Sequence, residues 1–163
     1  MERRVAELHI TNARARALRL FQTGSTIFPE EWATQIDEQT VVDLAEFAIH
    51  ARRVVELCDL RSLNFTGADS TRHKYTVVPP EPLEANFHDA LNKLIHAKTY
   101  AVGHAIWDGP KVFTASAQNM VVSYMRISTD RRPSSCISVF GLAWCFLTQV
   151  IPSLKSRHPE IQF

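Results

Sequence analysis

The residues with the clearest chemical potential in this sequence are Asn92 and His96, which lie four positions apart in the segment LNKLIHAK. On a helix this spacing puts two side chains on the same side, one turn apart. A histidine changes its charge near neutral pH and can move a proton, while an asparagine amide both donates and accepts hydrogen bonds. Lys93 or Lys98 would add positive charge. The segment therefore predicts a polar cleft suited to an anion or to proton transfer.

Residues 91–98 resemble the signature helix of the HEPN-like all-α domains, in which an Arg, an Asn and a His line a shared cleft. Asn92 matches the Asn of that family and His96 matches its His, whereas Leu91 stands where the family has its Arg. The resemblance implies metal-independent ribonuclease chemistry, in which the His moves the proton of a ribose hydroxyl. The Arg would hold the phosphate through two parallel hydrogen bonds.

Because Leu91 replaces the Arg, the resemblance implies a catalytically degenerate HEPN-like domain that acts as a binding or bacterial-defence module. RNA is one candidate ligand, and a homodimer is the expected assembly. One alternative is an active endoribonuclease in which His96 works with an arginine from elsewhere, for which the candidates are Arg52, Arg53 and Arg126. A further alternative is that Asn92 and His96 are solvated groups opposite the core.

Other histidine and glycine patterns favour neither a metal nor a nucleotide cofactor. His88, His96 and His104 recur every eight residues, so each is rotated by about 80° from the last on a helix and the three do not converge on one ion. The sequence has no His-Glu-x-x-His pattern and no Gly-rich phosphate loop. An Arg–His spacing at Arg4 and His9 lies in a different helix from the family's motif, so we treat it as coincidence.

Two charged faces have no predicted role in chemistry. Asp43, Glu46 and His50 lie on one side of a long predicted helix, and the first helix is rich in arginine, with Arg16 and Arg19 one turn apart. The arginine-rich face does not interleave aromatic residues, as surfaces for single-stranded nucleic acid do. We expect both faces to be solvated.

Composition indicates one globular cytoplasmic domain spanning residues 1–163, since the hydrophobic fraction is 45% and the net charge is only +1. So small a charge provides no overall electrostatic attraction to nucleic acid. Cys58, Cys136 and Cys145 are odd in number and lie in apolar surroundings. We expect buried free thiols in a reducing cytosol.

Hydrophobic periodicity predicts a mainly α fold: an up-and-down helical bundle with a β-hairpin insertion between the last two long helices. The pattern around Pro29 favours a further helix start. A long connection is expected at 64–82, with a short extended piece at 75–78. The predicted helices cover residues 4–23, 40–61, 81–106 and 136–154, and the predicted hairpin covers 111–129, turning near 117–119.

The last predicted helix is notable because residues 133–154 contain no charged side chain. That length could span a bilayer. Thr148, Gln149 and Pro152 oppose this reading, since hydrocarbon cannot satisfy their polar groups. We therefore expect a helix buried in the fold, with Trp144 packed and the remaining apolar surface forming the dimer interface.

Overall fold

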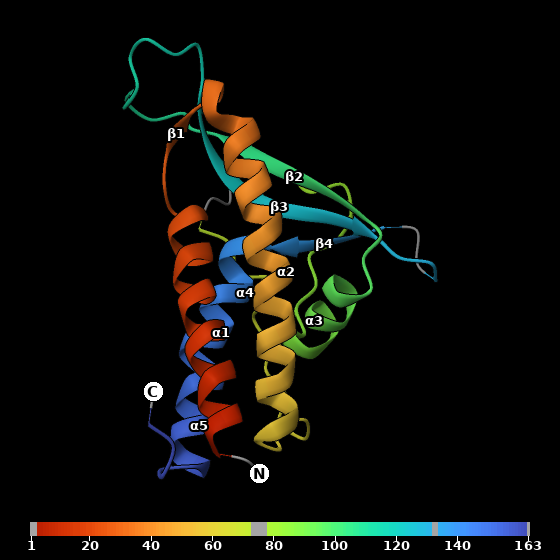
Figure 1. Ribbon diagram of the computed structural model, residues 1–163. Coiled ribbons are helices and arrows are strands. Elements are labelled where there is room, and N and C mark those ends of the chain that lie inside the picture. Colours follow the sequence, from red (N-terminus) through yellow and green to blue (C-terminus); the bar gives the residue numbers. More distant parts are fainter. Residues whose placement is uncertain (1–2, 73–77, 132–133, 163) are drawn as a thin grey trace.

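The computed structural model describes residues 3–72, 78–131 and 134–162. Three long helical segments lie side by side in Figure 1. A short helix, α3 (Phe87–Ile95), packs against α2 on the side away from α1. The long segments are α1 (Arg3–Thr23), α2 (Ala33–Leu57) and a C-terminal segment composed of α4 (Val139–Cys145), the π-helical turn η2 (Phe146–Val150) and α5 (Ile151–Arg157).

Small residues bring α1 and α2 close together. Alanines recur at three- and four-residue steps on the facing sides of both helices, and short side chains at a contact reduce the distance between helix axes. The stripe on α1 also carries Ile10 and Leu20, and that on α2 carries Leu44, Phe47 and Val54, all of them buried.

A four-stranded antiparallel sheet passes behind α2 in the view of Figure 1. Its central strand, β3 (Asn119–Ser128), pairs on one side with β2 (Thr99–Ile106). On the other side it pairs with β1 (Phe28–Pro29) and β4 (Ser135–Ser138). A Cβ atom at Gly103 would lie 2.2 Å from the Tyr124 ring, so this position in β2 requires a glycine.

Aromatic rings join the helices into one core. Phe47 of α2 meets Phe146 of η2 at a centroid distance of 5.2 Å and Phe87 of α3 at 6.3 Å, both edge to face. This is a favourable arrangement for aromatic pairs. The three rings hold α3 against the long helices, and α3 is the element that carries Asn92 and His96.

The predicted helical bundle is right only in part, because the fold is mixed α and β. Residues 81–106 do not form one helix: α3 ends at Ile95, and Thr99–Ile106 form β2. The predicted hairpin is also displaced, since the strands are β2 and β3 and residues 107–118 form the loop between them. Thr99, Tyr100 and Val102 have high strand propensity, and their pairing with β3 outweighs the apolar spacing that suggested a helix.

Other elements agree more closely with the expected boundaries. The helix predicted at 4–23 is α1, and that predicted at 40–61 starts earlier, as α2, after a short 3-10 turn η1 (Glu30–Trp32). The last helix begins at Val139, where Ser138 Oγ accepts a hydrogen bond from the Gly141 N–H at 2.9 Å. The extended piece expected at 75–78 lies, except for Val78, outside the described residues.

Candidate functional site

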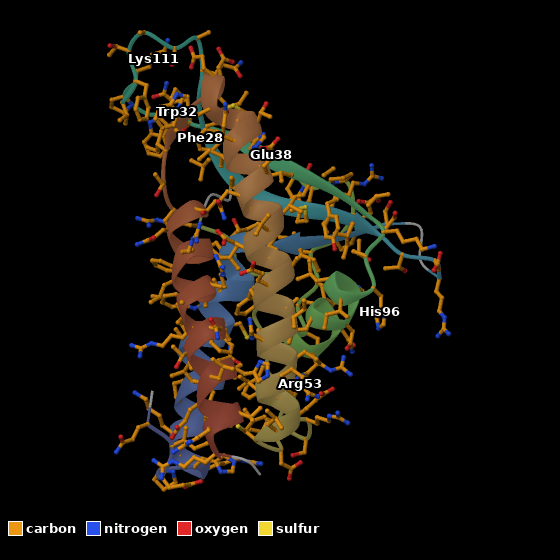
Figure 2. All side chains as sticks on the ribbon, in the orientation of Figure 1. Phe28, Trp32, Glu38, Arg53, His96 and Lys111 are labelled. Carbon is orange, nitrogen blue, oxygen red and sulfur yellow. The ribbon has the colours of Figure 1, made fainter. Side chains whose placement is uncertain are left out.

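Helix α3 places Asn92 and His96 at the surface and Leu91 in the core. The side chain of Asn86 caps the helix by accepting a hydrogen bond from the Asp89 N–H at 3.1 Å. Leu91 is fully buried, so the residue that stands in the place of the family's Arg packs in the core. Asn92 and His96 are exposed, and His96 is the first residue beyond the helix. Figure 2 shows His96 on the side of α3 that faces away from α2.

A cleft of about 680 Å³ opens between α3 and the segment that follows β3. Asn92 and His96 both line this cleft, so the fold brings the two sequence-predicted site residues to one place. The other lining residues are Asp89, Lys93, Thr129, Asp130 and Arg131.

A second, smaller groove of about 220 Å³ lies on the α2 side of α3. Asn92 lines this groove as well as the cleft, and therefore stands at the boundary between them. The groove is otherwise lined by Arg52, Val55, Arg61, His88 and Leu91.

Arg52 of α2 reaches the asparagine that the sequence pattern singled out. Its Nη1 donates a hydrogen bond to Asn92 Oδ1, and its Nε donates to Glu56 Oε1 at 2.8 Å. Leu91 occupies the position of the family's Arg and has no guanidinium. Arg52, from another helix, places a guanidinium beside Asn92 instead. Of the other two candidate arginines, Arg53 pairs with Glu56 and Arg126 forms two hydrogen bonds with Glu81.

The two lysines that were expected to supply positive charge both form ion pairs with carboxylates. Lys93 pairs with Glu84, and Lys98 pairs with Asp130. Arg131 also lines the cleft, and among the described residues no ion pair is found for it. The positive charge around Asn92 therefore comes from Arg131 in the cleft and from Arg52 in the neighbouring groove rather than from the lysines.

The three histidines at eight-residue intervals have separate environments. His88 bonds through Nε2 to the Leu63 carbonyl at 2.8 Å. His104, on β2, bonds through Nε2 to Oδ1 of Asp37, on α2, at 2.6 Å. Within the described parts of the chain, no three His, Cys, Asp or Glu side chains are grouped so that they could hold a metal ion.

The charged faces of α1 and α2 meet each other and are only partly solvated, which corrects the expectation from sequence in part. Asp43 is only 1% exposed and accepts hydrogen bonds or ion pairs from Arg16 at 2.8 Å and Arg19 at 3.2 Å. His50 meets His9 across the same interface. A signal was present in the sequence, because two arginines one turn apart can face two acidic residues, Asp43 and Glu46, at a similar spacing.

The three thiols are free and buried, as predicted. Burial raises the pKa of Cys58 and of Cys136 to about 11, and that of Cys145 to about 12. At neutral pH all three are therefore protonated, and the thiol form is a poor nucleophile.

The C-terminal helix is less buried than predicted. Trp144 is 43% exposed and stacks on Phe140 at a centroid distance of 5.9 Å and on Phe21 at 6.3 Å. The expectation that Trp144 is packed is therefore wrong. By length and composition Val139–Arg157 could cross a membrane, and half of its most apolar stretch is buried inside the fold.

No protein-family model, curated protein or solved structure matches this chain.

Proposed function

We propose that this domain binds RNA in the cleft beside α3, as a catalytically degenerate HEPN-like module. The observation that carries the proposal is the contact between Arg52 and Asn92 at the boundary of the cleft. With Arg131, this places arginine on both sides of an exposed amide and an exposed imidazole. Guanidinium groups bind phosphate through paired hydrogen bonds, and imidazole and amide groups can contact bases and riboses.

Binding without cleavage is favoured because His96 is not held in place. A general acid or base works when its ring is fixed within hydrogen-bond reach of the proton that it moves. The hydrogen bonds found for His96 among the described residues are made by its backbone N–H, to the carbonyls of Asn92 and Leu94, and none is made by its ring. Arg52 in turn lines the groove on the α2 side of α3 and not the cleft that holds His96, so it does not clamp a phosphate beside that imidazole.

The test is binding of a fluorescently labelled single-stranded RNA to the purified chain. Asn92→Ala and His96→Ala should each weaken binding by roughly 5- to 10-fold, the effect of one lost hydrogen bond. Arg14→Ala is the matched control, because Arg14 is exposed on α1 and is not a lining residue of the cleft. Equal affinity for all four proteins would refute the proposed site.

A second candidate is an active metal-independent endoribonuclease that uses His96. The observations in its favour are that His96 and Arg131 line the same cleft and that Arg52 lies next to Asn92. Incubation with mixed RNA in the presence of a metal chelator separates the two functions. We expect no cleavage by the wild type, whereas robust cleavage that His96→Ala abolishes would establish the enzyme.

The cellular setting of this proposal comes from the resemblance rather than from the geometry. It suggests a cytoplasmic module associated with bacterial defence, working as a homodimer. We place the dimer contact on the last helix, where Phe140 and Trp144 leave aromatic surface uncovered.

A further inference from the structure

Three arginines converge on a single carboxylate at the C-terminal end of α2. Glu56 pairs with Arg52 at 2.8 Å, with Arg53 at 3.2 Å and with Arg61 at 3.0 Å. The Arg52 and Arg53 contacts join neighbouring turns of one helix, but Arg61 comes from the connection that follows α2. Arg61 therefore adds a third guanidinium to a carboxylate that already pairs with Arg52 and Arg53.

The charges in this cluster do not cancel. Three guanidinium groups and one carboxylate leave two positive charges, because arginine stays protonated in proteins. The Glu56 side chain is only 20% exposed, whereas those of Arg52, Arg53 and Arg61 are 36%, 52% and 65% exposed. The negative partner is thus recessed and the unneutralised positive charge faces solvent.

The cluster borders a concave surface rather than a flat one. Arg52 and Arg61 line the 220 Å³ groove, and the polar side chains of His88 and Asn92 line it with them. Its floor is the buried pair Val55 and Leu91. Two arginines and the NH2 group of Asn92 therefore lie around a small space on an apolar base, and such groups donate hydrogen bonds to phosphate.

We propose that this groove binds a terminal phosphate of an RNA strand, a phosphomonoester at the 5′ or 3′ end. A phosphomonoester carries a charge of about −1.5 to −2 at pH 7, which matches the two excess positive charges. The phosphodiester inside a strand carries only one. This inference rests on the proposed function, since Asn92 borders both spaces and RNA lying in the cleft would bring its end to the groove.

The experiment compares three RNA oligonucleotides of one sequence with the full chain: one with a 5′ phosphate, one with a 3′ phosphate and one with neither. One phosphorylated end should bind about tenfold more tightly than the unphosphorylated strand, the effect of one or two charge-assisted hydrogen bonds. Arg61→Ala should remove this preference, and Arg61→Lys should restore it only in part because the planar fork is lost. Arg14→Ala, the control with the same loss of charge, should retain it.

The outcomes separate this inference from the proposed function. Equal affinity for the three strands, with RNA binding still dependent on His96, would overturn the phosphate site and leave the proposed function standing. In a further outcome, ribose 5-phosphate would bind in an Arg61-dependent way while RNA would not bind at all. This would overturn the proposed function and would show that the phosphate does not come from RNA. A phosphoserine peptide that competes as well as phosphorylated RNA would likewise assign the groove to phosphoproteins. Because Arg61 is mostly exposed, its variants should melt like the wild type.

Discussion

The imidazole Nδ1 atoms of His9 on α1 and His50 on α2 lie 2.9 Å apart. At this distance one ring donates a hydrogen bond and the other accepts it, so the pair cannot hold a proton on both of these nitrogens. The contact lies within the interface between the two longest helices, beside Glu46 and Arg16. Protonation of both rings should therefore weaken the packing of α1 on α2.

The first prediction is a loss of stability in mild acid. Burial, the neighbouring His9 and Arg16 lower the pKa of His50 below its ordinary value of 6.5, and Glu46 only partly opposes them. The folded chain then binds fewer protons than the unfolded chain, so the contribution of His50 is complete above pH 6.5 and is lost as the pH falls below it. Melting curves between pH 8 and pH 5 should show a steeper decline for wild type than for His50→Gln. Parallel declines would contradict this.

The second prediction concerns the buried ion pair between α1 and α2. Asp43→Ala should destabilise the fold by roughly 1–3 kcal/mol, because it removes the buried carboxylate that accepts charge-assisted hydrogen bonds from the partly exposed Arg16 and Arg19. Glu46→Ala is the matched control: this carboxylate is 43% exposed and also contacts Arg16, so its loss should cost less than about 1 kcal/mol. Urea denaturation of the two variants measures the difference. Similar midpoints for both would show that the burial of Asp43 does not increase its contribution to the free energy of unfolding.

The third prediction is that the thiols resist modification in the folded protein. Cys58, Cys136 and Cys145 are buried, and burial raises the pKa of each to about 11 or 12. A thiol reagent added at pH 8 should label none of them quickly and all three after denaturation. Rapid labelling of two or more without denaturant would be incompatible with this arrangement.

The fourth prediction is that the chain forms a homodimer through its last helix. Burial of the exposed face of Trp144 would cover the aromatic surface that it shares with Phe21 and Phe140. Light scattering should report a dimer for the wild type and a monomer for Trp144→Glu. Trp32→Glu is the control, because Trp32 is also exposed but lies beside the β2–β3 loop (Figure 2). A wild-type monomer at high concentration would exclude the dimer.

Features that depend on neighbouring residues could be predicted from the sequence alone. The apolar stripes of α1 and α2 recur at three- and four-residue steps, and this periodicity is a local property of a helix. The burial of Leu91 and the exposure of Asn92 follow from the same reasoning within one turn of α3. The buried thiols could be predicted because each stands among apolar residues.

Features that depend on distant parts of the chain were decided only by the tertiary structure. Thr99–Ile106 has apolar residues at positions compatible with a helix or a strand, and pairing with β3 across a long loop selects the strand. Arg52 contacts Asn92 from 40 residues away, and Arg16 contacts Asp43 from 27 residues away. The energy of such contacts depends on how whole elements pack, so no local pattern reveals which arginine lies beside the candidate site.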